Sequence, residues 1–322
     1  MSVEDGKHSR DERAPFDEGI GTAYADPRYA RGLSEFGEPL ALARSGGWIL
    51  SRKVPGGSAD RDAMGSYPLF ACRDWRRLGE DLDDLGRDLV SLVLVVEPFA
   101  AVTRSELRRC FDSVEPFKRH HLVDLSHPPE LTASHHHRKM ARRAFRTVQV
   151  DVCRHPASFL DVWTDLYDGL VARKNLDGIK AFSPAAFAQH LRVPGTLMLV
   201  ARLDGIVVGA DWYYRAGEVA YAHLAAFTSD GYAVGASYAL QWRAIEILKA
   251  YGARWLTLGA GAGPEPSPDD GLEWFKAGWA SATAETQIAA RVFDRDRYAD
   301  LVAQAGAQLT NYFPGYRVDE LA

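Results

Sequence analysis

Runs of mostly apolar residues dominate positions 195–227, and short polar, glycine-containing links separate them, which is typical of buried strands bounded by turns. The pattern predicts strands at 196–203, 206–214 and 218–227. Asp204-Gly205 and Ala216-Gly217 separate them, and short glycine-containing links favour tight turns between antiparallel neighbours. A helix at 236–251 and a strand at 254–258 follow. This stretch therefore predicts an antiparallel meander that continues into a helix and a further strand.

The first half of the chain alternates short strands with helices, which is the pattern of an α/β unit. Its predicted elements are strands 39–43 and 48–53 in a hairpin, strand 67–72, helix 75–88, strand 90–96, helix 104–111 and strand 118–125. Residues 54–62 are expected to be a loop. Outside the meander region, the second half is predicted to contain helix 134–146, strand 148–152, helix 157–174, strand 286–292 and helix 295–309.

The segment His127-Pro128-Pro129-Glu130 interrupts this succession, since paired prolines end regular elements. We therefore expect a disordered tail at 1–16, an N-terminal lobe at 17–130 and a C-terminal domain at 131–322. Both units are predicted to be of the α/β (α+β) class, with mixed sheets and helices.

Composition and net charge argue against several classes of function. The chain has 322 residues, 47% of them hydrophobic, and a formal net charge of -5, which argues against a general nucleic-acid coat. We expect no DNA partner. The three cysteines are widely spaced and indicate neither a disulfide framework nor a metal motif. The longest apolar run, 89–96, is too short to span a bilayer, so we expect a cytoplasmic protein without a membrane span.

The segment 230–237 opens the helix at 236–251 and carries the first chemical signal. Backbone N–H groups at a helix N-terminus lack intrahelical partners and suit a phosphate or pyrophosphate. We expect the donor's pyrophosphate to contact Gly231, Tyr232, Gly235 and Ser237. An acyl-CoA or nucleotide donor is the expected ligand of this turn.

With these residues in view, the second half resembles the GNAT-like acyltransferases, and among them the Fem-type aminoacyltransferases and their acyl-CoA-using relatives. The resemblance is carried by the basic helix 134–146, the meander, the turn into helix 236–251, and Gly271-Leu272 followed by Phe275-Lys276 and Gly278. It implies two GNAT-like lobes, each a mixed and largely antiparallel sheet flanked by helices, with a cleft between them. It also implies transfer of an acyl or aminoacyl group to an amine.

Two departures bear on the donor. Tyr232 stands where the acetyl-CoA loop of the family has Gln or Arg, and the coiled-coil arm of some Fem enzymes is absent. We expect acyl-CoA as the donor substrate and no metal. The expected acceptor is an amine on a small molecule or a cell-envelope precursor. Transfer from aminoacyl-tRNA and a non-catalytic GNAT-like binding role remain the alternatives.

Three residues are candidates for the chemical step. His223 shares a strand face with Tyr221, and a neutral imidazole can accept the proton of an attacking amine. Asp211, on the neighbouring strand, is expected to orient His223 or to act as the base itself. Lys276 follows Phe275, a predicted substrate contact, and its ammonium can bind a phosphate or stabilise an oxyanion. A core histidine and a surface lysine are the structural alternatives.

Helix 134–146 carries a strongly cationic face. At 100° per residue, one arc collects His135, Arg138, Lys139, Arg142, Arg143 and Arg146. Arg138 and Arg142 are predicted to contact an anionic substrate; the alternatives are a solvated face or pairing with the acidic helix 75–88. Adjacent helical histidines point about 100° apart, so His135-His136-His137 is not expected to hold a metal.

Overall fold

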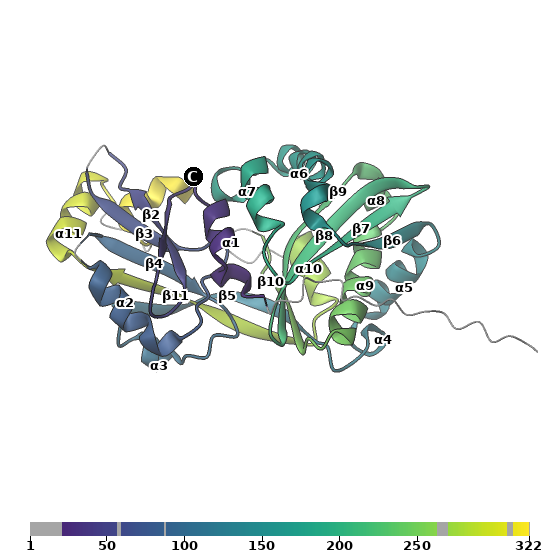
Figure 1. Ribbon diagram of the computed structural model, residues 1–322, viewed down its shortest axis with the longest axis horizontal. Coiled ribbons are helices and arrows are strands. Elements are labelled where there is room, and N and C mark those ends of the chain that lie inside the picture. The colour runs from purple at the N-terminus through teal and green to yellow at the C-terminus, as the bar shows by residue number, and fades with distance from the viewer. Residues whose placement is uncertain (1–20, 57–58, 87, 263–269, 308–311, 322) are drawn as a thin grey trace, which may run out of the picture.

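A computed structural model describes residues 21–56, 59–86, 88–262, 270–307 and 312–321. Its strands form one sheet of 11 strands in the order β1-β2-β3-β4-β11-β5-β10-β9-β8-β7-β6 (Figure 1). The strands are β1 Glu38–Ala41, β2 Trp48–Lys53, β3 Arg61–Gly65, β4 Ser91–Val96, β5 Ser113–Asp124, β6 Val148–Cys153, β7 Thr196–Leu203, β8 Ile206–Ala216, β9 Val219–Phe227, β10 Trp255–Gly259 and β11 Ala282–Val292. In the described part of the chain, only β3–β4 and β9–β10 pair in parallel as named strands.

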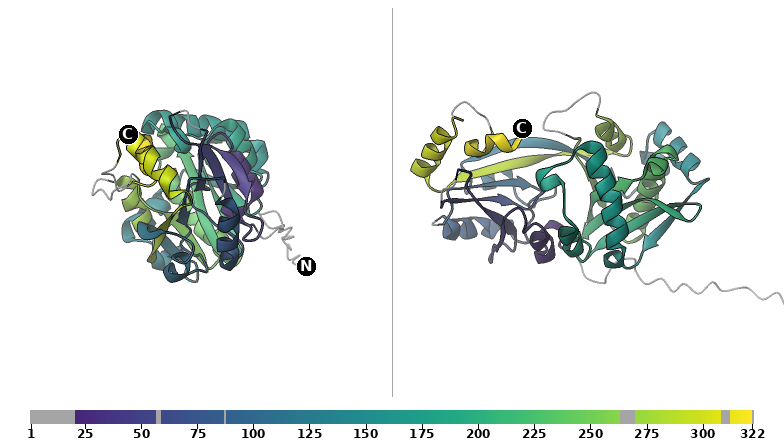
Figure 2. Two further views of the ribbon diagram at one scale, coloured as in Figure 1. Left: turned by 90° about the vertical axis from the view of Figure 1, so that its left-hand side faces the viewer. Right: turned by 90° about the horizontal axis from the view of Figure 1, so that it is seen from above.

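Helices cover both sides of this sheet (Figure 2). They are α1 Pro27–Gly32, α2 Leu78–Leu85, α3 Arg104–Leu107, α4 Pro129–Thr132, α5 His135–Ala144, α6 Leu160–Lys174, α7 Pro184–His190, α8 Ser229–Ala233, α9 Ala236–Ala250, α10 Gly271–Ala277 and α11 Arg295–Gln304. At the β6–β9 end, α9 and α5 pack on one face through a core around Leu240, Ile245 and Trp279. On the opposite face, α1, α6 and α7 enclose an aromatic core around Trp163, Trp212 and Tyr214.

Each lobe contains segments from the other half of the sequence. Strand β11 pairs with β4 over Gln287–Val292 and with β5 over Ala282–Ala290. After it, Leu301 of α11 and Tyr316 pack against Val54 and Val90. Conversely, Tyr24 and Tyr29, near the beginning of the described chain, belong to the aromatic core of the other lobe. The predicted boundary at residue 130 assigns β11 and α11 to the C-terminal domain, although they pair and pack with the first lobe.

The fold class predicted from sequence is confirmed, and so is the meander β7–β8–β9. The predicted strand 67–72 is wrong, since Phe70 makes an isolated bridge to Val96 and no strand forms there. The missing strand is β3, whose residues 61–65 overlap the predicted loop and pair with β2. Helix α7 was also missed. The predicted tail at 1–16 lies outside the described residues.

Candidate functional site

One large cavity of about 2600 Å³ extends across both lobes. Its wall on the first lobe includes Arg52 of β2, Met64 of β3 and Val95 of β4. On the second lobe it includes the face of β9 and side chains of α9 and α10. Ligand pockets for small molecules usually span about 300–1,000 Å³, so this cavity has room for two substrates at once.

Part of this cavity lies where two parallel strands separate. Strands β9 and β10 pair only over three positions, ending with Thr257 opposite Tyr221. Beyond that point β9 continues to Phe227 beside β8, whereas β10 remains paired with β5. Residues 222–225 of β9 line the cavity, as do Leu258 and Gly259 of β10. The separation therefore leaves a notch between two strands of the sheet, and we call it the β9–β10 notch.

The predicted pyrophosphate turn is in part a short helix, which corrects its expected role as an open loop. Within α8, the N–H of Gly231 donates to Thr228 Oγ1 at 3.1 Å, and the N–H of Gly235 donates to the Tyr232 oxygen at 3.1 Å. A Cβ on Gly231 would lie 2.1 Å from the Val208 oxygen, so this glycine permits close packing on β8. Most of the N–H groups expected to be open are thus already bonded.

The available N–H groups lie one step later, at the start of α9. Gly235 takes a left-handed conformation, with φ of 72°, and turns the chain from α8 into α9. Within the described residues, the N–H groups of Ala236 and Ser237 have no hydrogen-bond partner. Ser237 lines the cavity. Tyr232 instead lies outside the cavity lining, where its ring is 4.6 Å from the Arg173 guanidinium carbon.

Lys276 lies beside the β9–β10 notch, on α10. Asp270 caps this helix by accepting from Leu272 N at 2.9 Å and also accepts from Ala262 N at 2.6 Å. The ammonium donates to the Ala260 oxygen at 2.5 Å, and burial lowers the pKa of Lys276 to about 8. Phe275 packs against Tyr238 of α9, with ring centroids 5.2 Å apart. Lys276 and Phe275 both line the cavity, as predicted substrate-contacting residues should.

Sequence reasoning missed two further pairs of polar groups in the central strands of the sheet. His120 Nδ1 lies 3.3 Å from Thr257 Oγ1, and burial, with the nearby Lys276 charge, lowers the pKa of His120 to about 3. Tyr221, the last β9 residue paired with β10, donates its hydroxyl to Glu97. Burial raises the pKa of the Glu97 carboxyl. These residues come from β5, β9, β10 and the position that follows β4, and no local motif links them in the sequence.

His223 does not have the properties of the titrating base that we predicted. It is the extra residue of a β-bulge between the pairs Trp212–Leu224 and Tyr213–Ala222. Its ring stacks on Trp212 at 5.7 Å and lies 4.8 Å from the Tyr214 ring. Burial lowers its pKa well below 6.5, so the imidazole is neutral and hard to protonate near pH 7.

Asp211 was expected either to orient His223 or to act as the base. It does not orient His223. Successive strand residues point to opposite faces, so the Trp212 stack places His223 across the sheet from Asp211. Asp211 instead accepts from the Tyr213 hydroxyl at 2.7 Å, and burial raises its pKa to about 7. It lines the cavity near α9.

Arg138 and Arg142 lie on α5, and neither lines the cavity. Arg138 donates to the Glu130 backbone oxygen at 2.5 Å, while Arg142 is exposed. His137 is structural: its two ring nitrogens lie 2.8 Å from Ser134 Oγ and 2.9 Å from the Phe275 oxygen. Among the described residues, no group of three or more His, Cys, Asp or Glu side chains is placed to hold a metal ion.

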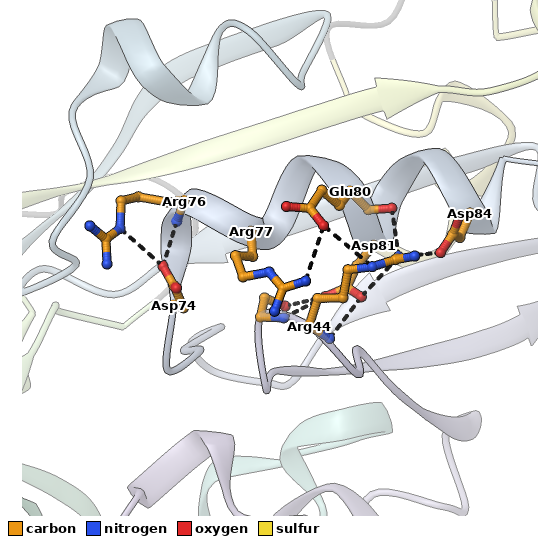
Figure 3. Close-up of polar contacts among 8 residues, drawn as sticks. Arg44, Asp74, Arg76, Arg77, Glu80, Asp81 and Asp84 are labelled. Carbon is orange, nitrogen blue, oxygen red and sulfur yellow. Dashed lines mark hydrogen bonds and ion pairs between the residues drawn. The ribbon is translucent and has the colours of Figure 1, made fainter.

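The alternative pairing of α5 with the acidic helix is wrong. Figure 3 shows that the carboxylates of α2 have other partners: Arg44 lies between Glu80, Asp81 and Asp84. Arg77 pairs with Glu80 at 3.2 Å on the same side. The cationic face of α5 therefore has no carboxylate partner on α2.

Comparisons with known proteins bear on the fold and the family. Residues 132–266 match the family described as Acetyltransferase (GNAT) domain. The chain is similar in structure to FemX, with a TM-score of 0.64 at 12% identity, covering 89% of this chain and 95% of FemX. It is also similar to a DUF2156 domain from Agrobacterium fabrum, with a TM-score of 0.61 at 17% identity over 86% of this chain and 91% of that one.

A third similar structure is L-PGS from Bacillus licheniformis, with a TM-score of 0.55 at 16% identity over 90% of this chain and 97% of that one. A search of curated proteins finds no match. At these identities the likeness establishes the fold. Together with the family match, it confirms the resemblance to GNAT-like and Fem-type proteins. None of the helices in the described ranges has the length and apolar character needed to cross a membrane.

Proposed function

We propose that this protein is an acyltransferase that moves an acyl group from acyl-CoA to an amine acceptor. The observation that carries the proposal is the β9–β10 notch, which has the half-buried Lys276 at one side and the free N–H groups of α9 beyond the end of β9. The helix terminus suits the pyrophosphate of the donor. The notch suits the thioester, because Lys276 can face the carbonyl oxygen.

In the proposed reaction the acceptor amine attacks the thioester carbon directly. A carbon–nitrogen bond forms, the carbon–sulfur bond breaks, and CoA leaves as the thiolate. The Lys276 ammonium stabilises the negative charge that develops on the carbonyl oxygen. The amine passes its proton to Tyr221 Oη while Tyr221 passes its own to the Glu97 carboxylate, its hydrogen-bond partner. This role replaces the one that we predicted for His223.

The size of the cavity supports an acceptor that occupies the first lobe. The donor half involves α9, β9 and α10, and the rest of the wall includes residues of β2, β3, β4, β5 and β11. Glu97 follows β4 of the first lobe, and Lys276 belongs to the second. Tyr221, which is hydrogen-bonded to Glu97, and Lys276 both line the cavity, which supports a site that uses residues of both lobes. Small amines and larger cell-envelope precursors both remain candidate acceptors, and a cytoplasmic location stays a prediction.

The test is transfer by the purified full-length chain. Acetyl-CoA and longer acyl-CoA donors are offered with a panel of amines, and release of free thiol is followed together with the mass of the amide product. We expect Lys276→Met to lower kcat/KM about 10²-fold or more, as for loss of an oxyanion donor. The matched control is Lys174→Met on exposed α6, which should be unaffected. Absence of CoA binding and of transfer by the wild type would reject the proposal.

Aminoacyl-tRNA is a second candidate donor because of the cationic face of α5. Lys139, Arg142, Arg143 and Arg146 are exposed, and no ion pair to these side chains is present within the described ranges. The apolar face of the same helix packs at the start of α9, where Met140 comes within 3.7 Å of the Cβ position of Gly235, so the cationic face of α5 points away from that contact. A polyanionic donor would make binding strongly salt-dependent.

The distinguishing measurement is the affinity of Arg142→Ala/Arg143→Ala for each donor at rising salt. If tRNA is the donor, the double variant loses affinity for it and shows a shallower salt dependence. If acyl-CoA is the donor, its KM changes little in this variant. A protein that binds CoA but transfers nothing to any amine would instead have the GNAT-like binding role.

A further inference from the structure

Two buried polar atoms near the donor half of the cavity have no hydrogen-bond partner among the described residues. They are Oδ1 of Asp211 and Nε2 of Gln241. Asp211 is 5% exposed and Gln241 is 6% exposed, and both residues line the cavity. A buried polar atom without a partner costs roughly 1–3 kcal/mol, so a pair of them in one wall calls for an explanation.

The two side chains belong to one arrangement. The hydroxyl of Tyr213 lies 2.7 Å from Asp211 Oδ2 and 3.3 Å from Gln241 Oε1. Tyr213 is 1% exposed and therefore held in place by its packing. The single proton of this hydroxyl is donated to Asp211 Oδ2, the nearer of the two oxygens, and Gln241 Oε1 lies beside the same hydroxyl. The remaining atom of each, an acceptor on Asp211 and a donor on Gln241, is left for another molecule.

Their position lies along the path expected for a donor. Gln241 is four residues after Ser237, so both face the same side of α9 about one turn apart. Asp211 pairs with Ala225 of β9, four residues beyond Tyr221, where β9 and β10 separate. The pair therefore lies between the free N–H end of α9 and the β9–β10 notch.

We infer that Asp211 and Gln241 form a subsite for an amide group of a substrate, whose N–H donates to Asp211 Oδ1 and whose oxygen accepts from Gln241 Nε2. The inference rests on the proposed function. An acyl-CoA donor supplies such a group in its pantetheine arm, which joins the pyrophosphate to the thioester. A peptide-like acceptor is the other source of the same chemistry.

An amide satisfies both atoms, whereas the rival ligands satisfy one. An ammonium group would pair with Asp211 but leave the Gln241 donor unused, and a phosphate would do the reverse. Burial raises the pKa of Asp211 to about 7, so an uncharged partner suits this carboxyl better here than at its ordinary pKa. A catalytic base at this position would also leave Gln241 without a role.

The experiment compares four acyl donors that differ in their amides: acyl-CoA and acyl-pantetheine with two, an acyl N-acetylcysteamine thioester with one, and an acyl S-ethyl thioester with none. Gln241→Met removes the donor atom at similar volume. We expect kcat/KM to fall about tenfold for the amide-containing donors and less than twofold for the S-ethyl thioester. Gln287→Met is the matched control, because Gln287 also has a buried unpartnered amide atom but lies outside the cavity lining.

Asp211→Asn separates binding from base catalysis. If Asp211 contacts an amide of the donor, this change raises the donor KM, leaves the pH profile of kcat intact, and does not affect the S-ethyl donor. If Asp211 is a catalytic base, the change lowers kcat about 10²- to 10⁴-fold with every donor, and that result would overturn the inference. Thermal unfolding of each variant verifies that it is folded.

The source of the amide is decided by the acceptor. The loss of kcat/KM caused by Gln241→Met can persist with the S-ethyl donor and disappear with an alkylamine acceptor. In that case the subsite binds an amide of the acceptor. An equal penalty in all combinations, or none, overturns the subsite.

Calorimetric titration with CoA distinguishes failure of the amide subsite from failure of the proposed acyltransferase function. Wild-type binding that is unchanged in Gln241→Met rejects only a pantetheine-binding subsite. Failure of the wild type both to bind CoA and to use any thioester rejects the proposed function, and the pantetheine assignment fails with it.

Discussion

Lys276 should make the stability of the protein depend on pH in a way that a neutral residue cannot. Burial lowers its pKa to about 8 from the ordinary 10.5. Because the unfolded chain holds the proton more tightly, the buried ammonium opposes folding fully below pH 8. This cost disappears as pH rises from the folded pKa towards the unfolded one. Replacement by methionine removes the titration but keeps the length of the side chain.

The size of the effect follows from the shift. One pKa unit corresponds to about 1.36 kcal/mol. Between pH 7 and pH 9.5, wild type should gain about 2 kcal/mol of unfolding free energy relative to Lys276→Met. The comparison across pH is independent of the hydrogen bond to Ala260 that the variant loses, since that loss is nearly the same at each pH.

The assay is urea unfolding of wild type and Lys276→Met at several pH values, followed by circular dichroism. Lys174→Met, on an exposed surface, should follow wild type throughout. A constant difference between wild type and Lys276→Met from pH 7 to pH 9.5 would refute the reasoning, because the lysine would then be hydrated in the folded protein. In catalysis, an ammonium of this pKa predicts that kcat/KM declines above about pH 8 in wild type.

Three further outcomes are expected. Gly231→Ala should destabilise the fold by about 1–3 kcal/mol in urea unfolding, since its Cβ would lie 2.1 Å from the Val208 oxygen, whereas Gly169→Ala, with open space around it, should be neutral or stabilising by up to about 1 kcal/mol. Glu97→Gln should lower kcat about 10²- to 10⁴-fold; unchanged turnover would exclude this carboxylate as the proton acceptor. His223→Phe should preserve the pH profile of kcat between pH 6 and 8; loss of a limb near pH 6.5 would restore His223 as the base.

Local patterns predicted the architecture of the second lobe well. Apolar runs and glycine-containing turns are short-range signals, so β7, β8, β9 and α9 were within reach of sequence reasoning. Strand β3 was not, because its parallel partner β4 lies about 30 residues later and its own five residues include Arg61 and Asp62. Buried ion pairs make those charges tolerable there: Asp62 accepts from Arg52 at 3.2 Å.

The candidate site was predictable only where a motif carried it. Lys276 was found through the Phe-Lys pair, and it does line the cavity. Glu97, His120 and Thr257 had no such signal, because their significance depends on pairing between β5, β9 and β10. His223 misled for the same reason: alternation along β9 could not reveal a bulge, nor the aromatic rings that surround the imidazole.

The exchange of segments between the lobes bears on the order in which the chain can fold during synthesis. Strand β4 lacks its neighbour β11 until residue 292 has been made. Strand β5 likewise cannot pair with β10 and β11 until those strands have been synthesised. The amino-terminal lobe therefore cannot complete its sheet while the ribosome is still translating the rest. Such sequence-distant pairing slows folding. Separate expression of residues 17–130 should yield an aggregation-prone fragment with an open sheet edge, and the notch should assemble only in the finished chain.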